Sequence, residues 1–171
     1  MISEDEAIQL VKNTSKYSHA LLVSAIMAEL AKQLNEDVKL WRIVGLLHDL
    51  DYDEVREDMR KHGVAAAEKL MGRLPEVAIH AIKAHDYRTG FKPKSRLDKA
   101  LIAADSAAVL MDKMKDSGIE LNPETFWMEI EKASKTMPWH KDNIMRCVEI
   151  GLSLNVFLQI CSTVMSRSNQ H

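Results

Sequence analysis

Every long segment of this 171-residue chain places its apolar residues three and four positions apart, the spacing of one face of an α-helix. None shows the alternation of apolar and polar residues that is typical of a half-buried strand. Helices are expected over residues 3–12, 16–33, 36–50, 62–73, 75–86, 95–115, 122–135 and 142–166. Their expected caps are Ser3, Asn35, Ser95 and Asn122. The sequence therefore predicts an all-α fold.

The length of the chain allows one domain with a substantial core and is short for two ordinary domains. Hydrophobic residues make up 46% and charged residues 28%, a balance that excludes intrinsic disorder. No internal repeat, linker or low-complexity tract divides the sequence. We expect residues 1–171 to form a single domain.

The net charge of -2 gives no general attraction to a nucleic acid duplex or to an anionic membrane. The longest apolar stretch, residues 150–164, is interrupted by polar residues and is too short to cross a bilayer. The acidic start, residues 1–6, is unlike a secretory signal. Cys147 and Cys161 would lie about 21 Å apart on one helix, too far to bridge each other. Reduced thiols predict a cytoplasmic protein.

Residues 45–53 end an apolar helical run in an adjacent imidazole and carboxylate, His48 and Asp49. An ionised carboxylate at the end of a largely buried helix needs a cation, an arginine or several hydrogen-bond donors. The alternative is a helix end at which Asp49 simply reaches solvent. This stretch alone does not distinguish the two, so other residues must decide.

Two further polar residues lie on apolar helical faces. His19 shares a face with Leu22 and Ile26, a position where a lone histidine usually bonds a backbone carbonyl. Asp105 lies in an apolar stripe, although aspartate is a poor helix former and is rarely buried unpaired. Taken with His48 and Asp49, these side chains form a nitrogen and oxygen set suited to Fe, Mn, Co or Zn, with no cysteine among them.

Two more histidines are candidates for the same region. His62 begins a helix, and His85 lies on the apolar face of the next one. His80 is five residues before His85, about 140° around the helix, and is expected at the surface. A histidine bonded to a backbone carbonyl remains the alternative for both candidates.

His19, the pair His48-Asp49 and Asp105 within Ile102-Ala-Ala-Asp105 together resemble the HD superfamily of metal-dependent phosphohydrolases. The resemblance covers roughly residues 16–112. It implies a single-domain HD-type helical bundle with that stretch as its core and the helices of residues 122–166 packed on it. It also implies that the four residues bind a divalent transition metal.

Members of this superfamily with two metal ions carry further histidines between the pair and the last aspartate, where this chain has His62 and His85. The resemblance then implies one or two ions. Asp49 would bridge them or accept a proton, and His62 and His85 would serve as ligands or contact the phosphate. Asp86 and Phe91 depart from the pattern of cyclic dinucleotide phosphodiesterases, which argues against that activity. Asp51-Tyr52 replaces the Gly-Lys that commonly follows the pair.

A small phosphorylated substrate would need positive or hydrogen-bonding neighbours at the rim of the site. Residues 51–61 carry no apolar period and are expected to form a solvated loop, and residues 87–94 form a second loop marked by glycine and proline. The candidates from these loops are Tyr52, Arg56, Lys61, Arg88 and Lys92. Each is also explained as an ordinary solvated side chain.

The resulting hypothesis is a metal-dependent phosphohydrolase acting on a phosphoester, mono- or diester, of a nucleotide or another small phosphorylated metabolite. A di-iron oxygenase of the same superfamily would use the same ligands and is the first alternative. A non-catalytic nucleotide-binding or regulatory HD module is the second, and the missing Gly-Lys favours it. A homodimer is left open.

Overall fold

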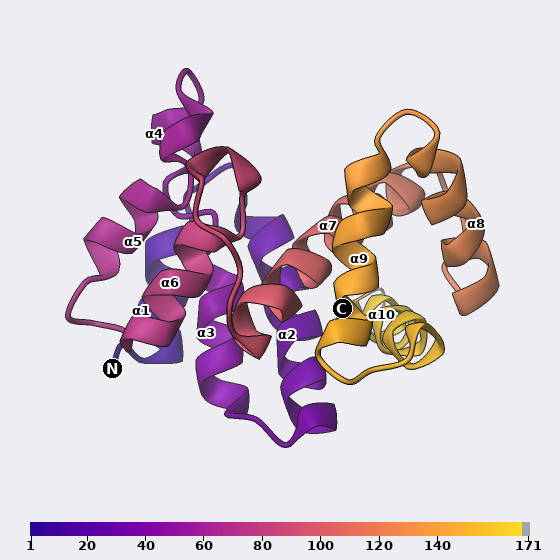
Figure 1. Cartoon of the computed structure of the whole chain (residues 1–171), viewed down its shortest axis with the longest axis horizontal. Helices are drawn as coiled ribbons and strands as arrows, with labels where there is room; N and C mark the ends of the chain where they lie inside the picture. Colours follow the sequence, from indigo (N-terminus) through magenta and orange to yellow (C-terminus); the bar gives the residue numbers. More distant parts are fainter. Residues whose placement is uncertain (169–171) are drawn as a thin grey trace.

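The computed structural model describes residues 1–168, and over these residues the chain is helical without a strand, so the all-α prediction is confirmed. Two long helices, α2 (Tyr17–Leu34) and α7 (Arg96–Asp116), run through the middle of the molecule (Figure 1). On one side lie α1 (Glu4–Val11), α3 (Val38–Leu47), α4 (Tyr52–Val55), α5 (Val64–Leu70) and α6 (Glu76–Ala84). On the other lie α8 (Pro123–Ser134), α9 (Pro138–Glu149) and α10 (Leu154–Ser168).

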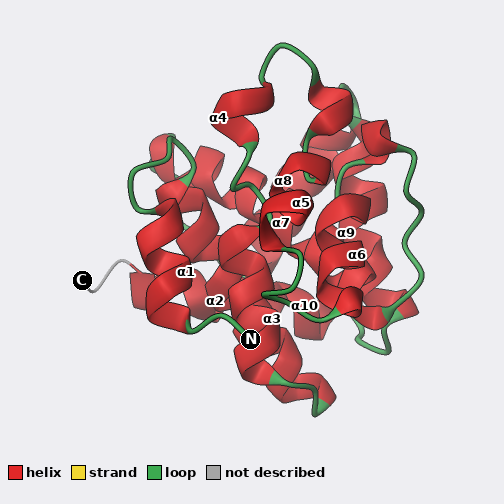
Figure 2. Ribbon diagram, turned by 90° about the vertical axis from the view of Figure 1, so that its left-hand side faces the viewer, coloured by secondary structure: helices red, strands yellow, loops and turns green. Residues whose placement is uncertain are grey.

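Helices α2 and α3 form a hairpin with very close packing. A Cβ at Gly45 would lie 2.7 Å from the Cα of Ser24, so glycine is needed where the two helices cross. Asn35, expected to cap α3, instead ends α2 in the left-handed region with φ 55°. Asp37 caps α3 by accepting a hydrogen bond from the backbone of Leu40. The hairpin brings the start of α2 and the end of α3 to the same end of the molecule, which Figure 2 shows from the side.

The other caps agree with the sequence. Ser3 and Ser95 form capping boxes with Glu6 and Asp98, and Asn122 accepts from the backbone of Thr125 at the start of α8. These local hydrogen bonds fix where each helix begins. The start of α7 therefore follows from the sequence.

Two further sequence-based expectations are wrong. Residues 51–61 are not a loop but contain α4 and a 3₁₀ turn, Met59–Lys61, with Val55 buried beneath them. The last predicted helix is broken: α9 starts at Pro138, and α10 leaves it at 109° beyond Gly151, whose φ is 95°. Cys147 and Cys161 therefore lie on different helices, both buried as free thiols, and the spacing expected on one helix does not apply.

The C-terminal helices pack against α7 and α2 and extend the same core. Phe126, Ile144 and Phe157 are fully buried in it together with the central residues of α2 and α7. Among the described residues, no single helix has both the length and the apolar character needed to cross a membrane. The bent pair of α9 and α10 meets those two criteria only when its members are taken together.

Candidate metal centre

Four imidazoles converge on two carboxylates at the end of the α2–α3 hairpin. His19 comes from the start of α2, His48 and Asp49 follow α3, and Asp105 lies in the middle of α7. His62 follows the 3₁₀ turn and His85 follows α6. All four histidines and Asp49 are buried, and Asp105 is partly exposed. The structure thus brings together all six residues that the sequence suggested as ligands.

The Nε2 atoms of the histidines all face carboxylate oxygens. Asp49 Oδ1 lies 3.0 Å from His62, 3.3 Å from His48 and 3.5 Å from His85. Asp105 Oδ1 lies 2.9 Å from His19 Nε2 and 3.6 Å from His48 Nε2. One carboxylate oxygen therefore has three imidazole nitrogens around it.

The opposite ring nitrogens are held by acceptors. His48 Nδ1 donates to the Gly45 carbonyl at 2.8 Å, and His85 Nδ1 donates to the Ile82 carbonyl at 2.7 Å. Because a carbonyl only accepts, each Nδ1 carries the hydrogen, and a neutral ring then has a lone pair on Nε2. Metal-binding histidines are typically oriented in this way by acceptors behind them.

The inward lone pairs leave the site short of positive charge. His62 Nε2 and His85 Nε2 are 3.1 Å apart, and His48 Nε2 is buried without a hydrogen-bond partner. Lone pairs and carboxylates at these separations repel each other unless a cation or a proton lies between them. The donor set therefore fits a divalent cation. His48 can share one such position with His19 and Asp105, and another with Asp49 and His85.

The pKa values of the cluster residues also show that the site favours positive charge. Burial lowers the pKa of His19 and His62, but hydrogen bonds to carboxylates raise these values to about 10 and about 9. Burial raises the pKa of Asp49, yet the neighbouring imidazoles hold it well below its usual value. Asp105 behaves likewise through His19 and His48. The buried Asp49 and the partly exposed Asp105 therefore attract cationic partners, and a metal can supply that charge in place of the protons.

A buried carboxylate that sequence reasoning missed orients His62. Asp51 accepts from His62 Nδ1 at 2.9 Å and from the backbone of Gly63 and Ala66 at 2.8 and 2.9 Å. Gly63 has φ 84°, and a Cβ there would lie 2.4 Å from the Ile82 carbonyl oxygen. The signal for Asp51 was its place directly after the His-Asp motif. Asp112 has a similar position behind His19, with Oδ2 3.3 Å from Nδ1.

Lys16 is a second residue that the sequence analysis overlooked. Its Nζ lies 3.7 Å from Asp49 Oδ2 and 4.0 Å from the centre of the Tyr52 ring. Tyr52 in turn packs edge-on against His62, with ring centres 5.5 Å apart. The spacing of Lys16 to His19, three residues on one helical face, could have identified it. An ammonium group therefore stands at the rim of the ligand cluster.

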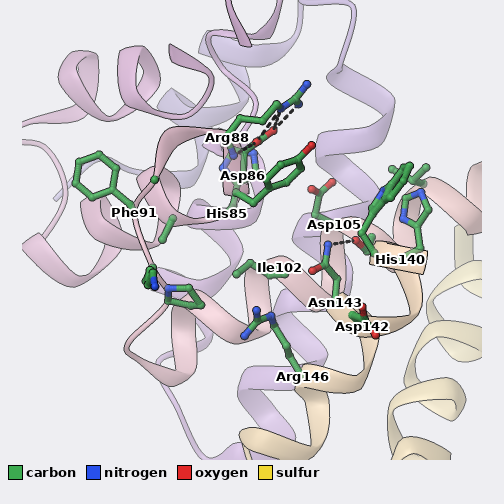
Figure 3. A pocket seen from close by; sticks show the side chains of 18 residues that line it. His85, Asp86, Arg88, Phe91, Ile102, Asp105, His140, Asp142, Asn143 and Arg146 are labelled. Atoms are coloured by element: carbon green, nitrogen blue, oxygen red, sulfur yellow. Dashed lines mark hydrogen bonds and ion pairs between the residues drawn. The ribbon is translucent and has the colours of Figure 1, made fainter. Parts of the chain in front are cut away.

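A cavity of about 760 Å³ opens beside the cluster, bounded by His85 and Asp105 (Figure 3). Residues 84–93, α7 and α9 form its walls. Of the expected substrate-binding residues, Arg88 and Lys92 line it, and the Arg88 guanidinium bonds Asp86. The wall from α9, which the sequence analysis missed, consists of Trp139, His140, Asp142, Asn143 and Arg146. No motif marks these residues.

The remaining candidates lie apart from this cavity. Exposed Arg56 bonds Asp53, and exposed Lys61 lies 3.8 Å from Asp58. His80, expected at the surface, is instead half-buried because its Nδ1 bonds the buried Asp98 at 2.9 Å.

Comparison with protein families agrees with this geometry. The family model described as the HD domain matches residues 17–110, which is more than half of the chain and includes all six cluster residues. No curated protein and no solved structure matches the chain. Domains of this family bind divalent metals and are typically metal-dependent phosphohydrolases. The chain belongs to the HD domain family, as its pattern of histidines and aspartates predicted.

Proposed function

We propose that this protein is a metal-dependent phosphohydrolase that cleaves a phosphoester of a nucleotide or another small phosphorylated metabolite. The observation that carries the proposal is the arrangement around Asp49 Oδ1, which has the Nε2 atoms of three buried histidines within 3.5 Å. Such a cluster is costly to bury for packing alone and is well suited to hold a cation.

His19, His48, Asp49 and Asp105 would hold a first ion, and Asp49, His62 and His85 a second. A bound divalent cation supplies a nucleophile at neutral pH by acidifying water, and offsets charge that develops on a phosphoryl oxygen. Asp49, whose Oδ1 faces the imidazoles and whose Oδ2 faces Lys16, would accept the proton of that water.

Lys16 is the proposed contact for the substrate phosphate. The family resemblance leads one to expect a lysine after the His-Asp pair, where this chain has Asp51 and Tyr52. Lys16 brings an ammonium group to the cluster from another helix, and the Tyr52 ring holds it there by a cation–π contact. Its side chain keeps 26% of its surface exposed, so it remains accessible to a ligand.

The test is metal content measured beside phosphoester turnover. Protein purified without added metal, and again after loading with Mn, Fe, Co or Zn, is analysed for bound metal and assayed on panels of phosphomonoesters and phosphodiesters. We expect bound metal, turnover that a chelator stops, and recovery when metal is returned. Uptake of far less than one equivalent of each of the four metals would contradict the proposal.

A di-iron oxygenase is the second candidate, favoured by the nitrogen and oxygen donor set, which suits iron equally well. The same panel run without oxygen separates the two functions. Phosphate release that persists anaerobically supports the hydrolase. Oxygen consumption coupled to loss of a test compound, without phosphate release, would replace it. Metal-loaded protein inert in both assays would favour a regulatory module.

A further inference from the structure

Three buried side-chain nitrogens within residues 1–168 have no hydrogen-bond partner: His48 Nε2, His140 Nδ1 and Arg146 Nε. The first belongs to the ligand cluster. The other two come from α9, and their side chains line the cavity beside that cluster. Leaving a buried polar group without a partner is costly. The α9 wall of the cavity therefore carries polar side chains whose hydrogen-bonding capacity the protein itself does not fully use.

The position of Arg146 follows from how α9 packs on α7. Asn143 Nδ2 donates to Ser106 Oγ at 2.9 Å, and Lys99 Nζ pairs with Glu149 at 2.9 Å, so the two helices run antiparallel. Arg146 lies three residues beyond Asn143, about 4.5 Å further along the helix. In Figure 3, Ile102 lies between Asp105 and Arg146. Arg146, Ile102 and Asp105 line the same cavity, so one small ligand can contact all three.

The charges around the cavity favour an anion at this end. Asp86 is bonded by Arg88, and Asp105 by His19. Lys92 lines the same cavity from residues 84–93 and adds a second cation.

Glu149 forms a long ion pair with Arg146, which offsets part of the Arg146 charge without using its hydrogen-bond donors. Glu149 lies 3.6 Å from Arg146 Nη1, beyond hydrogen-bond distance, and pairs more closely with Lys99. Asp142, which also lines the cavity, is exposed to solvent. The Arg146 guanidinium thus keeps donors available to a ligand.

We propose that Arg146 is a specificity-determining residue that holds a second anionic group of the substrate, a phosphate or a carboxylate, while the scissile phosphate lies at the ligand cluster. The inference rests on the proposed phosphohydrolase function and narrows its substrates to small phosphate esters with two anionic ends. Ile102 contacts the organic part between them, and Lys92 assists Arg146 from the opposite wall.

The experiment compares three esters of one chain length: butyl phosphate, 4-phosphooxybutanoate and butane-1,4-diol bisphosphate. We expect the metal-loaded protein to prefer one or both esters that carry a second anionic group by about 10- to 100-fold in kcat/KM, through a lower KM, as for a charged hydrogen bond. Arg146→Met removes this preference and leaves butyl phosphate within about twofold, and Arg146→Lys restores part of it. Arg96→Met, at an exposed arginine paired with Glu36 away from the cavity, is the matched control.

Equal rates for all three esters in the unmodified protein overturn the inference. So does an equal loss on all three in Arg146→Met, because Arg146 would then serve the scissile phosphate or the fold. If none of these three esters is hydrolysed, the broader phosphoester panel decides the proposed function, and ligand-induced thermal stabilisation decides the inference separately. The bisphosphate must then raise the Tm of the metal-loaded protein more than butyl phosphate does, and Arg146→Met must abolish that difference. No difference overturns the inference.

Discussion

The ligand cluster and the α9 wall border the same cavity, yet the chain encodes them differently. Apart from His62, which follows an exposed 3₁₀ turn, each cluster residue is polar where the helical pattern demands an apolar one or stands at the end of a buried helix. The wall residues His140, Asn143 and Arg146 come from a helix whose polar residues look like a solvent-facing side. Only the packing of α9 on α7 turns them toward the site.

The two regions should also differ in what they contribute. The cluster holds buried charges whose balance depends on every member. The wall contributes individual hydrogen-bond donors and acceptors around a large space. Substitutions in the cluster should therefore stop the chemistry, whereas substitutions in the wall should change which molecules are accepted.

The largest effect is expected from the cluster carboxylates. Replacing Asp105 or Asp49 by alanine should remove bound metal and lower kcat by about 10³-fold or more, since metal assistance is worth several kcal/mol. Helicity should persist in circular dichroism, and the Tm should fall because metal binding stabilises the folded state. Full metal content in either variant would show that the cluster does not depend on these carboxylates.

The next-largest effect is expected from the histidines that would hold a second ion. If Asp49 bridges two ions, replacing His62 and His85 together by alanine should lower the metal stoichiometry from about two toward one, measured by elemental analysis. The control is His80→Ala, because His80 lies in α6, the helix that precedes His85, but bonds Asp98 instead of the cluster. This variant should leave the metal stoichiometry unchanged. Unchanged stoichiometry with lost turnover would instead support one ion, with both histidines serving the phosphate or the leaving group.

These experiments address the residues that the sequence could predict, and the reason is energetic. Asp105 in an apolar stripe and Asp49 after a buried helix are costly positions, so they stand out without a structure. Helix starts at Ser3, Ser95 and Asn122 were predictable because the capping hydrogen bonds are local. The same reasoning applies to every feature that a few neighbouring residues determine.

The features that the sequence did not predict depend on residues that are distant in the sequence. The break between α9 and α10 was missed because apolar spacing continues through residues 142–166 while Gly151 turns the chain. Lys16, Asp51 and the α9 wall acquire their roles only through contacts with distant residues, such as Asp49 for Lys16 and Ser106 for Asn143. The sequence marks Lys16 and Asp51 only by their closeness to His19 and to the His-Asp pair, and it does not mark the α9 wall at all.

Lys16 tests the rim of the ligand cluster. Lys16→Met keeps the length of the side chain and removes the ammonium group near Asp49. We expect kcat/KM for a phosphomonoester to fall about 10- to 100-fold, the range of one charged hydrogen bond, with metal content retained. Lys39→Met, at a lysine in the first turn of α3, is the control. Loss of metal in Lys16→Met would assign this lysine to the cluster's structure instead.

The pH dependence of stability should have opposite signs in the two regions of the metal-free protein. The folded pKa values of His19 and His62, about 10 and about 9, exceed the unfolded value. Their stabilisation is therefore complete below about pH 6.5 and is lost as pH rises through about 9 to 10. Burial lowers the pKa of His140, so this histidine takes up a proton more readily in the unfolded chain than in the folded protein. The folded protein therefore loses stability as the pH falls below about 6.5.

Urea denaturation of chelator-treated protein across this range measures both effects. His140→Gln should remove only the loss at low pH. Metal-loaded protein should show weaker metal binding at low pH, because protons compete for the ligand nitrogens. Stability of the metal-free protein that stays flat up to about pH 10 would contradict the charge balance derived for the cluster.

The smallest effect concerns the hydrogen bond that attaches the wall to α7. Asn143 donates to Ser106 at 2.9 Å, a bond worth about 1 kcal/mol of unfolding free energy. Each single alanine variant also gains helix propensity, which masks part of that loss. A double-mutant cycle of Asn143→Ala and Ser106→Ala cancels the propensity terms and should give a coupling of about 1 kcal/mol in urea denaturation. Because neither residue contacts the ligand cluster's nitrogens, metal content should be the same in all three variants. A loss of metal would mean that the wall holds Asp105 in place, and the two regions would then be one site energetically as well as in space.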